Sequence, residues 1–250
     1  GSTEVGRTLL EQSAQQIIST SMELGGNAPF LVFEDADIDA AVEGAMVAKM
    51  RNGGQSCIAA NRFLVHEAVA DSFGAAFAER MRSVKVGPGM EPDVDLGPLI
   101  NQGAQEDMME SVELAADAGG DVLAGGRAPE RPGFFFEPTV LAKVPAGSAV
   151  LEREIFGPVA PIVTFSTEEE AVAMANDTIH GLAAYLYTAD LSRGLRVAEA
   201  LESGMVGINR GLISDPAAPF GGVKQSGVGR EGGHEGMKEF LEIKYIAASW

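Results

Sequence analysis

The sequence is poor in cysteine, histidine, basic residues and long apolar runs. It contains one Cys and three His among 250 residues. A single cysteine excludes an internal disulfide framework and fits a reducing cytoplasm. No apolar run reaches the length of a membrane span. Only 18 Lys and Arg accompany 36 Asp and Glu, giving a formal net charge of −18. Such a surface repels nucleic acids and anionic membranes, so neither is expected as a partner.

The three histidines do not indicate a metal site. His66, His180 and His234 fall in an expected strand, an expected loop and the start of an expected helix. No two of them have the spacing that metal ligands show on one element. We therefore assign no metal.

Strand-like and helix-like segments alternate along the chain. Apolar periodicity predicts helices over residues 6–18, 37–50, 68–84, 102–118, 167–176, 192–202 and 234–240. Apolar runs predict strands at residues 19–24, 30–33, 62–67, 121–124, 159–165, 183–188, 205–209 and 241–247, with an extended arm at 134–140. This alternation predicts an α/β fold with a mostly parallel sheet and helices on both faces.

The only cysteine lies in the stretch Arg-Asn-Gly-Gly-Gln-Ser-Cys at residues 51–57. The two glycines allow a tight turn, and a helix is expected to enter the stretch and a strand to leave it. Side chains at the ends of such elements are where sites tend to be built. A lone cysteine is by residue type more often a small buried hydrophobe than a nucleophile, so its neighbours must decide.

Three further motifs accompany the cysteine stretch. They are Met-Glu-Leu-Gly-Gly-Asn at 22–27, Glu-Ile-Phe-Gly-Pro at 154–158 and Pro-Phe-Gly-Gly-Val-Lys-Gln-Ser-Gly at 219–227. In this order the four motifs resemble the aldehyde dehydrogenase family, from Gly1 to about Ile246. The resemblance implies the catalytic-domain fold of that family and covers only the second half of a family member.

The resemblance also divides the chain into three parts. Residues 1–26 would be the trailing edge of an incomplete dinucleotide-binding domain, residues 27–229 the catalytic domain, and residues 230–250 a C-terminal helix and oligomerisation strand. The strand at 241–247 would be an open edge able to pair with another subunit, so a homo-oligomer is expected. Because a second family oxyanion donor belongs to the upstream half, we expect no turnover from this chain alone.

The family chemistry assigns two catalytic roles. Cys57 would attack an aldehyde, a hydride would pass to NAD or NADP, and water activated by Glu23 would hydrolyse the thioester. The backbone N–H of Cys57 can serve as an oxyanion donor. Free cysteine has a pKa of about 8.5, so its environment must favour the thiolate or supply a base. We expect native Cys57 to react with iodoacetamide faster than the unfolded thiol.

A cofactor site is expected beside the cysteine. A glycine-serine turn before a helix suits a phosphate, and in the family this turn lies against the cofactor pyrophosphate. Glu154 matches the glutamate that holds the nicotinamide ribose, and Phe156 would lie beside the ring. The sequence does not distinguish NAD from NADP. The candidate cofactor-binding residues are Gly1, Ser2, Leu24, Gly25, Glu154 and Phe156.

Substrate choice depends on Arg51, Ser214 and Phe220. The chain most resembles the succinate-semialdehyde dehydrogenase branch, where positions matching Arg51 and Ser214 bind the distal carboxylate. An arginine fork and a serine hydroxyl suit that group. Phe220 matches an aromatic residue that lines the substrate tunnel. Succinic and glutaric semialdehyde differ by one methylene and are not separated. Ala59 stands where some members carry a second cysteine, which excludes their regulatory disulfide.

Two alternatives remain open from the sequence. Cys57 could act in a cofactor-independent cysteine hydrolase, which would need a histidine partner that is not near in sequence. The chain could also be an inactive assembly module that keeps the catalytic fold for oligomerisation. Reaction with an activated ester but not an aldehyde would favour the first alternative. An absence of turnover in the complete enzyme would favour the second.

Overall fold

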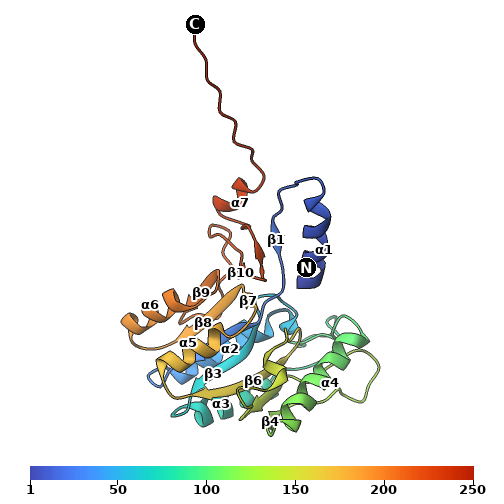
Figure 1. The fold of residues 1–250 in the computed structure, drawn as a ribbon. Coiled ribbons are helices and arrows are strands. Elements are labelled where there is room, and N and C mark those ends of the chain that lie inside the picture. The colour runs from blue at the N-terminus through green and yellow to red at the C-terminus, as the bar shows by residue number, and fades with distance from the viewer.

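A seven-stranded sheet forms the centre of the molecule in a computed structural model that describes residues 1–250 (Figure 1). Its strand order is β4-β5-β6-β3-β2-β8-β9, and every neighbouring pair is parallel except β4 with β5. This confirms the predicted mostly parallel sheet. The strands are β2 (Ala28–Val32), β3 (Ala60–His66), β4 (Asp121–Ala124), β5 (Thr139–Ala142), β6 (Val159–Phe165), β8 (Ala183–Tyr187) and β9 (Met205–Ile208).

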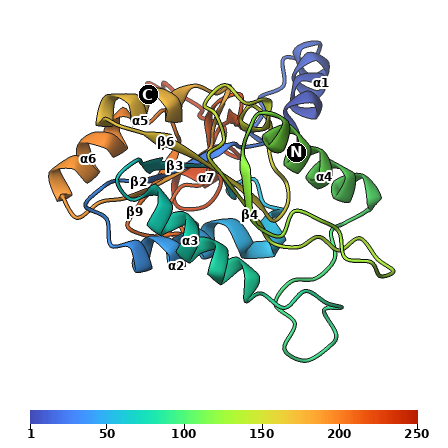
Figure 2. The same ribbon diagram turned by 90° about the horizontal axis from the view of Figure 1, so that it is seen from below.

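Helices cover both faces of the sheet, as predicted (Figure 2). Each face buries its own apolar cluster, and the inner strands β2 and β8 are buried at every residue. Continuous apolar strands of this kind are typical of parallel sheets covered on both sides. The helices are α2 (Ile38–Met50) and α3 (Ala70–Arg82) on one face, and α4 (Gln102–Asp117), α5 (Glu168–Asn176) and α6 (Leu191–Ala200) on the other.

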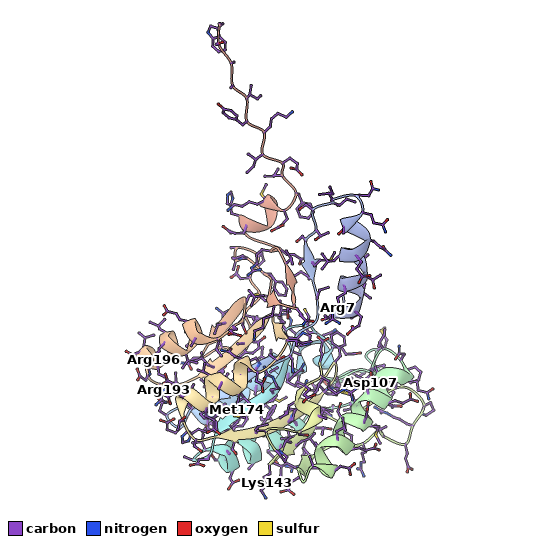
Figure 3. All side chains as sticks on the ribbon, viewed as in Figure 1. Arg7, Asp107, Lys143, Met174, Arg193 and Arg196 are labelled. Atoms are coloured by element: carbon purple, nitrogen blue, oxygen red, sulfur yellow. The ribbon has the colours of Figure 1, made fainter.

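Aromatic packing fixes the α2–α3 face of the sheet. Phe30 on β2 has no exposed surface, and its ring centroid lies 5.2 Å from that of Phe63 and 5.1 Å from that of Tyr187. Aromatic pairs at such distances contribute beyond the area that they bury. On the other face, Arg193 and Arg196 lie together on α6 (Figure 3). Arg196 binds Glu168 of α5 with a 2.7 Å ion pair, which joins the two helices at the surface.

Smaller elements lie at the edge of this body. The two-stranded pairs are β1 with β11 and β7 with β10, all of them two residues long. They stand beside the N-terminal helix and the last helical turn (Figure 1). These elements are α1 (Thr3–Ala14), β1 (Met22–Glu23), β7 (His180–Gly181), β10 (Val223–Lys224), β11 (Gly227–Val228) and α7 (Glu235–Lys238), together with the 3-10 turns η1 (Arg51–Gly54) and η2 (Ala149–Leu151).

The predicted strand at residues 241–247 does not form within the single chain. These residues form neither helix nor strand and extend away from the body (Figure 1). Their apolar side chains are exposed, among them Ile243 at 100% and Tyr245 at 88%. A strand needs a neighbouring edge to satisfy its N–H and C=O groups. No edge of this chain pairs with the segment, so the apolar composition alone does not make it a strand.

Several predicted boundaries also need correction. The first helix begins at Thr3 rather than residue 6, because the Ser2 hydroxyl accepts from the Val5 N–H and caps it. It ends at Ala14, before Ile17 takes a left-handed φ of 55°. Only two residues of the predicted strand 19–24 pair. Of the predicted arm 134–140, only its last two residues enter a strand. No helix is both long and apolar enough to cross a membrane.

Candidate active site

The turn before Cys57 redirects the chain from α2 into β3. Asn52, Gly53 and Gly54 have consecutive left-handed φ values of 53°, 64° and 77°. Glycine takes this conformation without strain, and asparagine is among the few other residues that tolerate it. The Asn52 side-chain amide donates to the Gln55 carbonyl at 2.8 Å and closes the turn. Cys57 is therefore presented at the strand end, as the sequence predicts.

Close backbone packing joins this turn to two of the other motifs. A Cβ added to Gly26 would clash with the carbonyl oxygen of Cys57, and one added to Gly54 would clash with the carbonyl of Gly157. Glycine is required at both positions because no side chain fits between the two backbones. The segments 22–27 and 154–158 thus lie directly against the cysteine turn.

The fourth motif reaches the same place through strand pairing. In the pair β1–β11, Glu23 lies opposite Gly227. The Leu24 N–H extends this contact by donating to the Ser226 carbonyl at 3.0 Å. All four motifs quoted in the sequence analysis therefore meet around one centre.

A cavity of about 530 Å³ opens at this centre. Cys57 and Glu154 line it from two motifs that are almost a hundred residues apart, and the start of α1 lies at its rim. Sequence reasoning missed Gln55 and Ser56, although their position directly before Cys57 was a usable signal. The lining residues are Gly1, Ser2, Gly25, Gln55, Ser56, Cys57, Glu154 and Phe156.

Five candidate residues do not line this cavity: Glu23, Leu24, Arg51, Ser214 and Phe220. Leu24 is buried, and its side chain packs against Gly6 of α1 instead of facing the cavity. Phe220 is partly buried and packs on the same core cluster as Cys57, without lining the cavity.

Arg51 and Ser214 contact each other directly. The Nη1 group of Arg51 donates to the Ser214 hydroxyl at 2.9 Å, although the two residues are 163 positions apart. Arg51 is exposed at the start of the cysteine turn, and no carboxylate forms an ion pair with it. The guanidinium therefore keeps free donors beside a hydroxyl, which is the donor set that a carboxylate needs.

The environment of Cys57 does not favour its thiolate. Burial raises the pKa of the thiol, and the carboxylates of Glu154 and Glu23 raise it further. Its own backbone N–H acts in the opposite direction. This raised pKa acts against the expected faster reaction of native Cys57 with iodoacetamide, which stays a prediction. The sequence analysis requires surroundings that either favour the thiolate or supply a base. Because these surroundings do not favour the thiolate, activation of Cys57 would need a nearby base.

Glu23 has the protonation behaviour of such a base. Burial raises its pKa to about 7, and the charge of Glu231 contributes in the same direction. Its Oε2 atom is buried without a hydrogen-bond partner. A carboxylate that changes protonation near neutral pH and keeps an open acceptor can receive a proton from water or from a thiol.

Glu154 is more firmly held. The Gly26 N–H donates to its Oε1 at 3.1 Å. Burial raises the pKa of Glu154, whereas the Gly26 N–H and the charge of Lys49 lower it. A Cβ on Gly25 would come within 2.8 Å of Glu154 Oε2, so the absence of a side chain there leaves that oxygen open to the cavity.

No histidine contact reaches Cys57. His66 bonds to the Ser166 carbonyl and approaches Glu34, and the Nδ1 of His180 lies 3.2 Å from the Gly25 carbonyl. The hydrolase alternative therefore lacks the imidazole partner that it requires. No group of three or more His, Cys, Asp or Glu side chains has an arrangement that could hold a metal ion.

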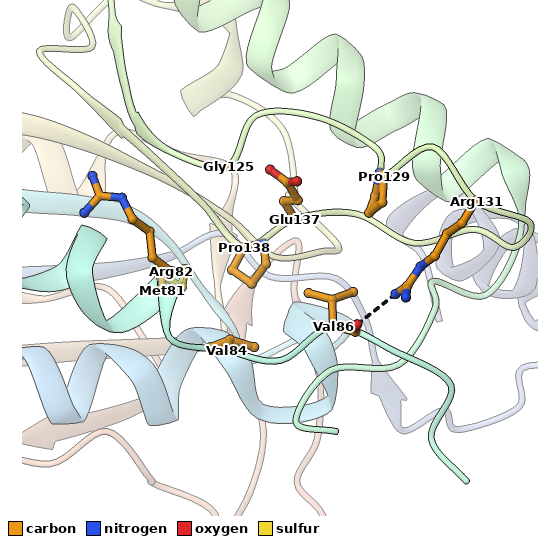
Figure 4. Close-up of a pocket in the computed structure, with 9 residues that line it drawn as sticks. All are labelled: Met81, Arg82, Val84, Val86, Gly125, Pro129, Arg131, Glu137 and Pro138. Carbon is orange, nitrogen blue, oxygen red and sulfur yellow. Dashed lines mark hydrogen bonds between the residues drawn. The ribbon is translucent and has the colours of Figure 1, made fainter. Parts of the chain in front are cut away.

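A second cavity lies away from this centre. It has a volume of about 420 Å³ and opens between the end of α3 and the segment that joins β4 to β5 (Figure 4). Arg131 borders it and donates to the Val86 carbonyl at 2.8 Å. Arg82 and Glu137 are the other charged residues around it. None of the candidate site residues predicted from the sequence lines this cavity.

The fold is α/β with a mostly parallel sheet, and a cysteine and two carboxylates come together at one end of that sheet. The chain belongs to the aldehyde dehydrogenase family, whose family model matches residues 1–246. This confirms the resemblance carried by the four motifs. A succinate-semialdehyde dehydrogenase from Burkholderia pseudomallei has the same fold, with a TM-score of 0.97 and 53% identity over 98% of this chain and 51% of that chain.

Two curated relatives carry semialdehyde dehydrogenase names. The succinate-semialdehyde dehydrogenase of Paenarthrobacter nicotinovorans is 57% identical over 98% of this chain and 55% of that protein. The glutarate-semialdehyde dehydrogenase of Pseudomonas putida is 53% identical over 100% of this chain and 52% of that protein. This chain spans about half the length of the curated relatives it matches.

Proposed function

We propose that this chain is the catalytic half of an NAD(P)-dependent dehydrogenase that oxidises a carboxylate-bearing semialdehyde, with succinic semialdehyde favoured. The observation that supports this most directly is the shared cavity of about 530 Å³, in which Cys57 and Glu154 face the turn at Gly1 and Ser2. A thiol, a carboxylate and a helix N-terminus around one cavity can serve an aldehyde and a dinucleotide together.

The residues around the cavity fit a nicotinamide cofactor. Gly25 leaves the Oε2 atom of Glu154 open, and this carboxylate oxygen can accept from ribose hydroxyls. The N-terminus of α1 at Ser2 suits a phosphate. When bound, the cofactor would accept a hydride from the substrate carbon. NAD and NADP remain alternatives, because the residues that read the ribose belong to the upstream half of family members.

The first chemical step belongs to Cys57. After Glu23 or water removes the thiol proton, the sulfur attacks the aldehyde carbon, and the carbonyl electrons move to the oxygen to form a thiohemiacetal. The Cys57 N–H makes no backbone hydrogen bond and can donate to this oxyanion. Loss of hydride restores the carbonyl and leaves a thioester on Cys57.

Glu23 completes the cycle as the general base. It accepts a proton from water, the hydroxide equivalent attacks the thioester carbon, and the carboxylic acid leaves as the sulfur departs as a thiolate. A base with a pKa of about 7 is half ionised near neutral pH, where proton transfer is efficient. The raised pKa of Cys57 makes this base necessary in the first step as well.

Arg51 and Ser214 would hold the distal carboxylate of the substrate. Their 2.9 Å contact places a guanidinium and a hydroxyl together at the start of the cysteine turn. Both relatives' names specify semialdehydes of dicarboxylic acids, which carry this second carboxylate. The pair does not select for substrate length, so the four-carbon and five-carbon semialdehydes are both compatible with it.

Arg51→Leu tests the substrate assignment in an enzyme that contains this half. We expect kcat/KM for succinic semialdehyde to fall roughly ten- to hundredfold, because a hydrogen bond to a charged group contributes about 1.5–3 kcal/mol. The value for a neutral aldehyde of similar length should stay nearly constant. Steady-state kinetics with both substrates measure the difference.

Arg127→Leu is the matched control for this variant. Arg127 is another exposed arginine, paired with Glu137 at 3.1 Å and remote from the cysteine turn in sequence. It should leave both kcat/KM values unchanged. Equal losses on the two substrates in Arg51→Leu would show that Arg51 does not select for the carboxylate.

A further inference from the structure

Lys49 is a fully buried lysine on α2, two residues before the cysteine turn begins at Arg51. It has no exposed surface, whereas the neighbouring inward residues of the helix, Val42, Ala45 and Ala48, are apolar. Burying an ammonium group costs several kcal/mol unless it is paired and hydrogen-bonded. An apolar side chain would fill this place at lower cost, so the lysine needs a reason beyond packing.

The contacts of Lys49 join segments that carry the candidate site. Its Nζ donates to the Asn61 side-chain oxygen at 3.0 Å and to the Ile155 carbonyl at 3.3 Å. Asn61 lies four residues after Cys57, and Ile155 lies between Glu154 and Phe156. One buried side chain thus bonds the segment after the nucleophile to the loop that presents two cavity residues.

The hydrogen bonds continue into the glycine segment. The Asn61 amide donates to the Gly26 carbonyl at 3.5 Å, and the Gly26 N–H donates to Glu154 Oε1 at 3.1 Å. The first of these is long, and the second is of ordinary length. Lys49 therefore stands at the buried end of a chain of polar contacts that ends on the Glu154 carboxylate.

Arg62 shows what a purely structural buried cation looks like in this fold. Its guanidinium donates to the carbonyls of Asn27, Met174 and Ala175 at 3.1, 2.9 and 2.8 Å. Two of these carbonyls lie in the last turn of α5, where a cation satisfies open acceptors. Lys49 does not cap a helix end. Both of its partners lie in segments that flank the cavity.

We propose that Lys49 is a positioning residue that holds the Glu154–Phe156 loop against the Cys57 turn through its hydrogen bonds to Asn61 and Ile155. This inference rests on the proposed function, because Glu154 and Cys57 are the groups that it positions. Burial lowers the pKa of Lys49 to about 7, and the Glu154 carboxylate acts in the opposite direction. The same carboxylate raises the pKa of the Cys57 thiol. Glu23 and the Tyr185 hydroxyl are the other side chains whose titration is coupled to Cys57.

Lys49→Met tests this role through the pH dependence of Cys57 alkylation in the 250-residue chain. Cys57 is the only cysteine, so the iodoacetamide rate reports one site. Without the two Nζ hydrogen bonds the Glu154–Phe156 loop loosens and admits water to the thiol. Burial is the main cause of the raised pKa of Cys57, so better solvation lowers that pKa. The inflection of the rate profile should therefore move down by about half a pH unit or more.

Lys85→Met is the matched control, because Lys85 is exposed after α3 and its side chain makes no hydrogen bond. It should leave the inflection in place, and at a pH below the inflection only Lys49→Met should react about threefold faster. Profiles are recorded well below the thermal midpoint of every chain. A lower midpoint with an unchanged or higher inflection in Lys49→Met would overturn the proposal.

Asn61→Ala decides the question if Lys49→Met does not fold. It removes the middle of the same chain of contacts while the Lys49 bond to the Ile155 carbonyl remains, so a smaller shift in the same direction is expected. An unchanged inflection in a folded Asn61→Ala would also overturn the proposal. Alkylation requires neither aldehyde nor cofactor, so a failure of the Arg51→Leu test would reject the substrate assignment and leave this result intact.

Discussion

Glu23 and Glu154 come from two different motifs that meet at Cys57, and the surroundings of the two carboxylates differ. Burial raises the pKa of both, to about 7 for Glu23. Glu154 receives the Gly26 N–H at 3.1 Å and is offset by the charge of Lys49. Glu23 keeps an unpartnered buried oxygen. Burial and the charge of Glu231 raise its pKa and outweigh Arg230 and the N-terminal ammonium, which lower it.

The difference separates a reactive group from a fixed one. A carboxylate fixed by a backbone hydrogen bond keeps its orientation, which suits a ligand for hydroxyl groups. A carboxylate with a pKa of about 7 and a buried oxygen that has no hydrogen bond can gain and lose a proton near neutral pH, which suits a general base. Under the proposed function, two residues of one type would take different roles because their surroundings differ.

Glu23→Gln should have the largest effect of any change to this pair. In an enzyme that contains this half, kcat should fall about 10²–10⁴-fold, because the amide cannot accept the proton from water. A single-turnover burst of reduced cofactor should persist if Cys57 can still be acylated. In the unmodified enzyme, kcat should rise with pH through about 7 as Glu23 loses its proton. Stopped-flow and steady-state rates measure these quantities.

Cys57→Ala provides the control, since it should remove both the burst and the turnover. If Glu23→Gln retained full turnover, Glu23 would not be the base, and the contrast between the two carboxylates would have no catalytic meaning.

The sequence predicted where these carboxylates lie but not how they differ. The motifs at 22–27 and 154–158 placed both residues near Cys57, because glycines in short motifs often mark positions where two backbones lie in contact. The charges that distinguish the two residues come from elsewhere in the chain. Glu231 acts on Glu23 from about two hundred residues away, and Lys49 was hidden in an apolar helix face. Such pairings depend on tertiary contacts that no local pattern encodes.

The fold shows the same division between local and distant information. Strands such as β6 and helices such as α2 follow their predicted ranges closely, because buried apolar faces and the Asp37 cap are local signals. The predicted strand at 241–247 has the right composition but no partner edge within this chain. Composition can show that a segment is able to pair, whereas pairing requires a second strand that the local sequence does not specify.

Glu154→Gln should weaken cofactor binding by an intermediate amount and lower kcat only slightly. We expect the KM for NAD or NADP to rise roughly ten- to hundredfold, because a hydrogen bond to a charged acceptor contributes about 1.5–3 kcal/mol. The value of kcat at saturating cofactor should change less than in Glu23→Gln. Initial rates across cofactor concentrations separate the two parameters. A loss confined to kcat would instead make Glu154 a second catalytic group.

The smallest expected effect is on the free energy of unfolding. It tests the difference between Glu23 and Glu154 without any substrate. Because the pKa of Glu23 is raised in the folded state to about 7, folding favours its protonated form. Ionising Glu23 therefore weakens the folded state, and stability is lost as the pH rises from about 5 to 8.

Glu23→Gln should cancel this loss and be more stabilising relative to the unmodified chain at pH 8 than at pH 5. Because Glu23 is only partly buried, solvent screening should limit the difference to about 1 kcal/mol or less. Glu154→Gln should show a smaller pH-dependent difference, since the Gly26 N–H and Lys49 offset the burial of that carboxylate. Urea unfolding at both pH values measures the three chains, with Glu113→Gln on the exposed side of α4 as the control. A larger pH-dependent difference for Glu154→Gln than for Glu23→Gln would reverse the assignment of the reactive and the fixed carboxylate.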